Sequence, residues 1–178
     1  SVSINRLTIN SSDLCYLEKD ISLYYCLTLA TMDWQGALDY STQPSDTADL
    51  NLKIKGDLSL ASFNIKNHTL SRNLLDFKTL TLSKLNIDGS NNISLAQLDL
   101  KTLTALQRGD EVNDNTAAFD RLTIDDIRHE KSSIAIDKIL LSGLSNTVSK
   151  NSNGQWEHDK WLTSQASEKN PEDKGEKK

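Results

Sequence analysis

The sequence predicts a mainly β protein: an elongated, curved antiparallel sheet of repeated strand–turn–strand units, with little helix. Three observations predict this fold. An eight-residue phrase of apolar residues recurs along the chain, a shorter repeat marks the starts of pairs of strands, and the stretch from Ala48 to Leu60 alternates strictly between apolar or small and polar residues.

The eight-residue phrase has the form apolar-x-apolar-x-x-apolar-x-apolar. Apolar residues two apart share one face of a strand, but the x-x pair reverses that parity. A bulge or bend at the pair, for example at Ser83-Lys84, would return both apolar pairs to one face. On a helix the same spacing gives no apolar stripe. The copies are LSLASFNI at Leu58, LTLSKLNI at Leu80, ISLAQLDL at Ile93, IAIDKILL at Ile134 and a weaker LTIDDIRH at Leu122.

The shorter repeat has the form apolar-x-x-Leu-Thr-apolar and precedes a polar stretch and a second apolar strand. Its copies are INRLTI at Ile4, FKTLTL at Phe77 and FDRLTI at Phe119, and the second strands begin at Ile21, Ile93 and Ile134. Asp88–Asn92 has the composition of a tight turn. Such units bury their apolar faces only by stacking on neighbouring units.

The alternation around Ala48–Leu60 predicts a strand with one dry and one wet face. Gly56, in the middle of this run, predicts a bend or a close approach of two backbones. Met32–Tyr40 is expected to be another strand and Ser41–Thr47 a loop.

Helix signals are few. Thr69–Asp76 is expected to form one or two helical turns, and Leu100–Arg108 fits either a short helix or a continued strand. Gly109–Thr116 is polar and is expected to be a surface loop.

The domain organisation is expected to be simple. Residues 1–162 form a single repetitive β domain, a segment of a larger protein, and residues 163–178 form a disordered polar tail or linker. The tail contains no large apolar residue, so it cannot bury enough surface to offset the entropy of ordering it.

Composition argues against several classes of function. The net charge of −5 comes from interspersed signs without a basic patch, which argues against nucleic-acid binding. No apolar run approaches about 18 residues, so no transmembrane segment is expected in this chain. His68, His129 and His158 are far apart and outside any metal-binding motif, and Asp125-Asp126 occupies a polar slot of the repeat. We therefore expect no metal, no cofactor and no enzymatic activity.

Cys15 and Cys26 are the two cysteines, and polar residues lie midway between them. A hairpin that turned near Asp20 would place them opposite each other, close enough for a disulfide. The alternative is two free, partly buried thiols. A disulfide would suit an oxidising compartment such as a periplasm.

The three tryptophans, Trp34, Trp156 and Trp161, are compatible with contact to carbohydrate or to a lipid surface. For Trp156 and Trp161, we favour a plug that closes over the edge of the sheet.

The stretch Gly56–Leu106 resembles the AsmA-like superfamily of bacterial envelope proteins, in particular a branch described as a domain of unknown function. The shared pattern is a Gly opening an amphipathic strand, LxLxxFxI, a polar link with LLxF, and then LxLxxLxI and IxLxxLxL. Asn151–Trp156 is similar to the N-x-x-G-x-aromatic element that closes such repeats. The resemblance implies a periplasmic protein, anchored to the inner membrane through a segment outside this chain, with an elongated sheet whose apolar inner face serves outer-membrane homeostasis and lipid movement.

Two functions remain open. The first is a lipid-accommodating groove or scaffold, with phospholipid or another amphiphile, or neighbouring repeats of the parent protein, as partner. Its candidate apolar residues are Leu50, Leu52, Ile54, Leu58, Leu60, Leu80, Leu82, Ile93, Leu95, Ile134 and Ile136. The alternative is a β interaction module of the cell envelope that binds protein or glycan through its edges or its Trp-rich end.

Overall fold

The computed structural model describes residues 2–18, 23–42, 50–88, 92–107, 115–130, 132–148, 150 and 153–154. All regular structure in these ranges is β, which confirms the prediction of a mainly β antiparallel fold. The strands are β1 (Val2–Glu18), β2 (Leu23–Thr42), β3 (Leu50–Asn67), β4 (Arg72–Ile87), β5 (Ile93–Gln107), β6 (Asn115–Glu130), β7 (Ser133–Ser142) and β8 (Ser145–Asn146).

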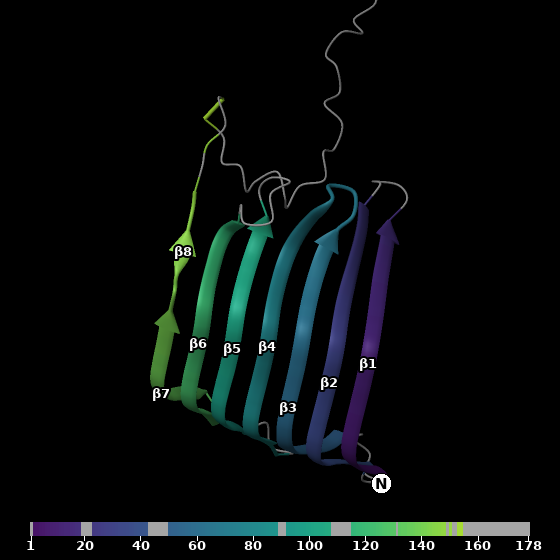
Figure 1. Ribbon diagram of the computed structural model, residues 1–178. Helices are drawn as coiled ribbons and strands as arrows, with labels where there is room; N and C mark the ends of the chain where they lie inside the picture. Colours follow the sequence, from purple (N-terminus) through teal and green to yellow (C-terminus); the bar gives the residue numbers. More distant parts are fainter. Residues whose placement is uncertain are drawn as a thin grey trace, which may run out of the picture.

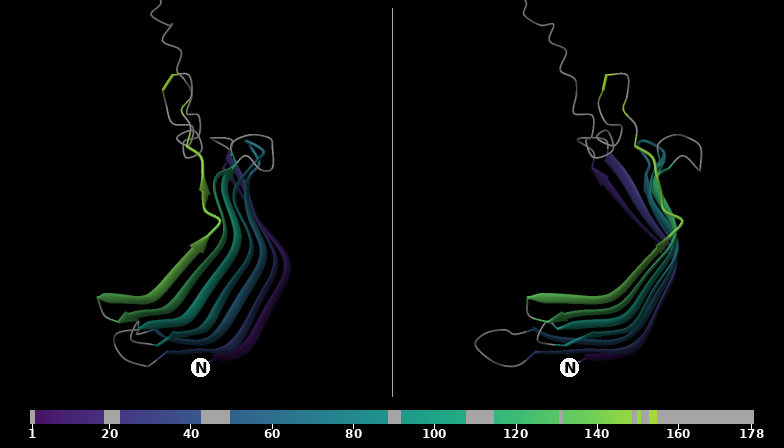
Figure 2. Two further views of the ribbon diagram at one scale, coloured as in Figure 1. Left: turned by 60° about the vertical axis from the view of Figure 1, so that its left-hand side comes forward. Right: turned by 90° about the vertical axis from the view of Figure 1, so that its left-hand side faces the viewer.

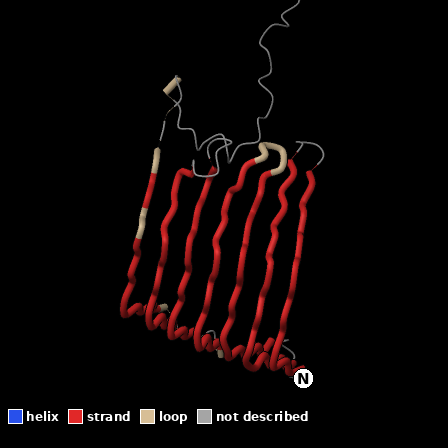
Figure 3. The backbone as a smooth tube through the Cα atoms, viewed as in Figure 1, coloured by secondary structure: helices blue, strands red, loops and turns tan. Residues whose placement is uncertain are grey.

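The strands form one open sheet in which each strand pairs antiparallel with the next in the sequence, in the order β1-β2-β3-β4-β5-β6-β7 (Figure 1). The short β8 continues beyond the end of β7 and also pairs with β6. Figure 3 shows the strands lying side by side, each running from the lower to the upper edge of the sheet or back. β1 and β7 are therefore the two outer strands of a single layer.

The sheet is strongly curved, because the long strands β1 to β6 each turn twice along their length (Figure 2). Viewed along the sheet in Figure 2, the strands give a profile that is open on one side, with a concave and a convex face. The arrowhead of β7 ends at the upper of the two turns. We call the two transverse lines the upper bend and the lower bend.

The upper bend is marked by a row of residues with positive φ. Ser11 (φ 49°) in β1 and Ser62 (φ 53°) in β3 lie on either side of Ala30, and Thr102 (φ 53°) follows in β5. Gly143 (φ 66°) directly follows β7. A positive φ inside a strand changes the direction of the chain and the parity of its side chains.

The lower bend passes through the x-x pairs of four copies of the eight-residue phrase, whereas the x-x pair of LSLASFNI lies at Ser62 in the upper bend. Lys84 (φ 54°) in β4 and Asp126 (φ 51°) in β6 have positive φ, so the predicted change of direction at Ser83-Lys84 is present. The β3–β4 register shifts at this point, and the backbone N–H of Lys84 donates to Oδ1 of Asp57 at 2.8 Å. In β2 and β3 the bend passes through a directly paired Gly36 and Gly56.

The glycine pair allows a close approach of the β2 and β3 backbones. A Cβ at Gly36 would overlap the carbonyl oxygen of Lys55, and a Cβ at Gly56 would overlap that of Gln35. Gly56 also has a φ of 155°, which side-chain-bearing residues rarely adopt. Both predicted roles of Gly56, a bend and a close backbone approach, therefore coincide at one place.

Two sequence predictions concerned helices. The expected helical turns in Thr69–Asp76 are wrong, because a turn ends at Ser71 and β4 begins at Arg72. Pairing of Leu75 with Ile65 and with Ala105 holds this segment extended. Leu100–Arg108 is resolved in favour of the strand, since β5 runs to Gln107. The expected turn near Asp20, most of the loops at Ser41–Thr47 and Gly109–Thr116, the expected plug at Trp156 and Trp161 and the tail 163–178 lie outside the described residues. The last two residues of the second loop, Asn115 and Thr116, belong to β6.

Cys15 and Cys26 are directly opposed in the β1–β2 register and are joined by a disulfide, with their Cα atoms 4.1 Å apart. The bridge ties the upper end of the outer strand β1 to β2. Cys26 is buried and Cys15 is exposed.

Candidate binding surface: the apolar concave face

Directly opposed residues of neighbouring antiparallel strands point to the same face, so the register defines which side chains lie together. Between the two bends, two rows cross the whole sheet and are apolar at every position. One row contains Leu7, Trp34, Leu58, Leu82, Leu98, Ile124 and Ile139. The other contains Ile9, Met32, Leu60, Leu80, Leu100, Leu122 and Leu141.

Four further rows extend this face beyond the bends. Below the lower bend, one row contains Gly36, Gly56, Leu85, Leu95, Ile127 and Ile136, and the next contains Ile4, Leu38, Ile54, Ile87, Ile93, His129 and Ile134. Above the upper bend, the rows contain Leu29, Phe63, Phe77, Leu103 and Phe119, and then Leu14, Leu27, Ile65, Leu75, Ala105 and Ala117. Each of these two rows has one polar member in an outer strand, Ser12 in β1 and Asn146 in β8. These six rows are the apolar face, and His129 is its single titratable residue.

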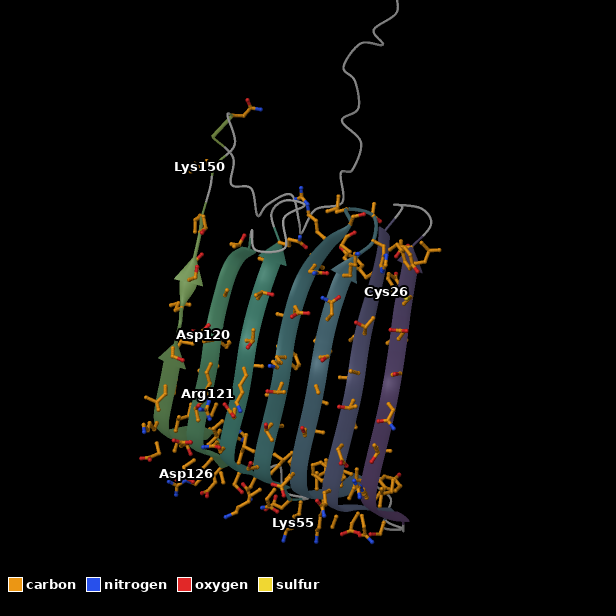
Figure 4. All side chains as sticks on the ribbon, in the orientation of Figure 1. Cys26, Lys55, Asp120, Arg121, Asp126 and Lys150 are labelled. Atoms are coloured by element: carbon orange, nitrogen blue, oxygen red, sulfur yellow. A yellow bond between two sulfur atoms is a disulfide. The ribbon has the colours of Figure 1, made fainter. Side chains whose placement is uncertain are left out.

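The apolar face is the concave one. Figure 4 looks onto the convex face, where Lys55, Arg121 and Asp126 project from the strands. Leu122 follows Arg121 directly in β6, so its side chain points the opposite way. The apolar residues stay on the concave face across each bend. The x-x pair shifts the alternation of side chains by one residue at the same place where the strand changes direction.

No second layer of described residues covers the apolar face, since all described strands belong to one sheet. Burial therefore comes from neighbours on the same face. In the inner strands Trp34 is 6% exposed and Phe77 and Leu95 are 7% exposed, whereas Ile134 on the outer strand β7 is 70% exposed. Phe77 stacks on Phe63 with ring centroids 4.8 Å apart.

The candidate residues read from the sequence lie on this one face, with the exception of Leu50. Leu50 pairs with Thr42, but its side chain lies outside the described part of the structure. Leu52 pairs with Tyr40 and continues the alternation of Ile54 toward the strand end.

Sequence reasoning missed several members of the face, above all Trp34 and the Phe63–Phe77 pair. The recurrence of Phe before an x-x pair, as in FKTLTL, was the available signal for Phe77. Nothing in the local sequence around Trp34 indicates that it is one of the most buried side chains, because its burial comes from strands β1 and β3.

The convex face is polar and carries a compact ion cluster. Nε of Arg121 donates to Oδ1 of Asp99 at 2.7 Å, its second nitrogen donates to Oδ2 at 3.2 Å, and Nζ of Lys101 lies 3.4 Å from Oδ2. Asp99 is 8% exposed. The hydrogen bonds from Arg121 hold the pKa of Asp99 below its usual value, although burial acts in the opposite direction.

A shallow depression of about 520 Å³ lies at the lower bend beside the glycine pair. It is lined by Gln35, Gly36, Lys55, Gly56, Asp57, Lys84, Leu85 and Asn86. The hydrogen bond from Lys84 to Asp57 lies within this lining, so the depression belongs to the structure of the bend.

The residues suspected of chemistry are dispersed. His68 stacks on Tyr24 at the upper strand ends, with ring centroids 4.7 Å apart. Asp125 accepts a hydrogen bond from Nε2 of Gln97 at 2.9 Å and pairs in register with Lys138. Across the ranges that the structure describes, no three His, Cys, Asp or Glu side chains are grouped as a metal site, and no helix there could span a membrane.

Comparisons of the chain with protein families, with curated proteins and with solved structures find no match. The resemblance to the AsmA-like superfamily therefore stays a prediction, and the functional argument depends on the geometry of the apolar face.

Proposed function

We propose that this chain is a non-catalytic, periplasmic β domain of an AsmA-like envelope protein. Its concave face holds the acyl chains of phospholipids or similar amphiphiles and thereby contributes to outer-membrane homeostasis. The observation that carries this proposal is the set of six apolar rows on a face that no described residue covers.

An uncovered face of this size favours an apolar occupant. Burying one methylene group contributes about 0.8 kcal/mol, so even one acyl chain laid along a row would supply substantial binding free energy. Strands in a sheet lie about 4.8 Å apart, which gives the rows a length of about 30 Å from β1 to β7. One leaflet of a bilayer contributes about 15 Å of hydrocarbon, so a row is long enough for an extended acyl chain.

Two other features support a place in the envelope. The Cys15–Cys26 disulfide suits an oxidising compartment. The convex face, with its ion pairs and hydroxyl groups, is suited to water. A sheet with one wet and one apolar face matches a protein that shields hydrocarbon from an aqueous space.

The proposal is tested by native mass spectrometry and lipid extraction of the purified protein, with a matched pair of variants. Leu82→Asp places a charge in the centre of the apolar face, and Thr79→Asp places the same charge on the convex face of the same strand, opposite Lys101. We expect co-purified amphiphile in the unmodified protein and in Thr79→Asp, and loss of it in Leu82→Asp. Circular dichroism checks that both variants keep the sheet.

Absence of any bound amphiphile, together with an effect of Leu82→Asp on stability alone, would remove the support for lipid binding.

The unpaired outer strands favour one other function, a module that binds protein or glycan. Ile134 and Ile139 in β7 are 70% and 58% exposed, and an outer strand offers free backbone groups for pairing. Such a module would bind its partner in the presence of Leu82→Asp. It would lose the partner on substitution of Trp156→Ala and Trp161→Ala, measured by surface plasmon resonance on envelope glycans and proteins.

A further inference from the structure

Trp34 carries the one side-chain hydrogen-bond donor of the central apolar rows. It lies between Leu7 of β1 and Leu58 of β3, and its side chain is 6% exposed. Its indole Nε1–H is buried and has no hydrogen-bond partner among the described residues. A buried donor without an acceptor is costly and therefore uncommon in folded proteins.

The place beside Trp34 is also unusual. Gly36 follows two residues later on the same face, and it pairs directly with Gly56. Further along this row, β4 to β7 contribute Leu85, Leu95, Ile127 and Ile136. Leu7 and Leu58 flank the unpartnered indole within its own row, whereas β2 and β3 contribute no side chain to the next row, where their backbones lie close together.

We propose that the Nε1–H of Trp34 donates a hydrogen bond to the ester carbonyl oxygen of an acyl chain bound on the concave face, beside the paired Gly36 and Gly56. This inference rests on the proposed function and specifies its ligand as an ester-linked acyl chain. No second layer of described residues covers the concave face, so a ligand on it would meet Trp34 without displacing other strands.

The residues around Trp34 determine which kind of acceptor group on a ligand can bind its indole N–H. An indole N–H only donates, so the ligand must supply an acceptor oxygen. The six apolar rows contain no Lys or Arg, and an ionised carboxylate without a cation is strongly disfavoured in apolar surroundings. A neutral ester carbonyl satisfies the donor without bringing a charge onto the face.

The test compares two probes of similar length in the delipidated full chain, methyl palmitate and heptadecane. Only the first has an ester. Affinities are measured by displacement of the fluorescent probe N-phenyl-1-naphthylamine. The Trp34 indole N–H is followed by NMR after ¹⁵N labelling of tryptophan, and its signal is assigned by its loss in Trp34→Phe.

We expect methyl palmitate to move the Trp34 indole proton downfield and heptadecane to leave it near its position in the free protein. Trp34→Phe should reduce the preference for the ester over the alkane by about five- to tenfold, as for the loss of one hydrogen bond. Leu58→Ala, a packing control in the same row, should weaken both probes and keep their ratio.

An unmoved indole proton with bound ester, or an equal loss of both probes in Trp34→Phe, would overturn this inference and leave acyl binding intact. Failure of both probes to displace the dye would overturn the proposed function as well. Where Trp34→Phe does not fold, the Trp34 signal is assigned by elimination, from the loss of the other two indole signals in Trp156→Phe and Trp161→Phe, and the NMR measurement on the unmodified protein then decides between the outcomes.

Discussion

The two faces of this sheet have opposite chemistry, although every strand contributes to both. The central concave row is apolar from Leu7 to Ile139, whereas the neighbouring convex row contains Thr8, Asp33, Ser59, Thr81, Asp99 and Thr123 before it reaches Leu140. The described strands form a single layer, so a side chain is buried by the strands on either side of it. Side chains of the inner strands are therefore more buried than those of the outer strands. The sheet is therefore stabilised by contacts between side chains of neighbouring strands on the same face. No described residue covers the concave face, which leaves it accessible to another molecule.

The sharpest test of this difference places the same charge on adjacent residues of β5. Leu95→Asp buries a carboxylate among apolar neighbours at a position that is 7% exposed. We expect it to lower the free energy of unfolding by about 3–4 kcal/mol. Ser94→Asp, on the convex face, should change it by less than about 0.5 kcal/mol. Urea denaturation followed by circular dichroism measures both, and equal effects would contradict the assignment of the faces.

Removing an aromatic ring from the concave face should have the next largest effect. Phe77→Ala deletes a side chain that is 7% exposed and stacks on Phe63. We expect a loss of about 3 kcal/mol in the free energy of unfolding. Thr79→Ala, on the convex side of the same strand, is the matched control, and thermal unfolding would reveal a wrong assignment as similar shifts in both variants.

Reduction of the disulfide tests how the outer strand is held. Cys15 and Cys26 close a short loop between β1 and β2, and a disulfide of this kind contributes about 2–3 kcal/mol. We expect a reductant to lower the melting temperature and to increase hydrogen exchange at the upper end of β1. Unchanged exchange there would mean that strand pairing alone holds β1 in place.

The smallest expected effect is the pH dependence of the convex ion cluster. The pKa of Asp99 is lowered in the folded state by the hydrogen bonds from Arg121, so its contribution is present above the pKa of the unfolded chain and is lost as the pH falls through the folded-state pKa. Asp99→Asn should therefore reduce stability at pH 7 and flatten the decline in acid. Asp33→Asn, whose partner Arg6 is 67% exposed, should have a weaker effect. Parallel acid-unfolding curves for Asp99→Asn and the unmodified protein would contradict this role.

Much of the fold could be predicted because strand pairing imposes a parity on apolar residues that is visible in the sequence. LTLSKLNI predicted a change of direction at Ser83-Lys84, and the positive φ of Lys84 lies there. In β4 the shorter repeat, FKTLTL, spans the upper bend, since Phe77 and Leu80 lie on either side of it. In β1 the same repeat spans the lower bend, between Ile4 and Leu7, so the bend to which each copy belongs follows only from the register.

Features that depend on distant pairing could not be predicted in this way. The Asp99–Arg121 ion pair joins residues that are 22 positions apart. The segment Thr69–Asp76 was predicted to be helical, whereas Leu75 pairs with Ile65 and Ala105, which are distant in the sequence. The burial of Trp34 likewise depends on β1 and β3, which flank β2.

The two bends lie at the same level in every long strand. Each added hairpin would therefore widen the sheet across its strands by the same amount. Duplication of one hairpin would insert two strands that repeat the same double turn, and the assembly would grow by about 10 Å while its cross-section stayed constant. Evolution can thus adjust the span of such a protein by unequal recombination, without redesigning any of its interior.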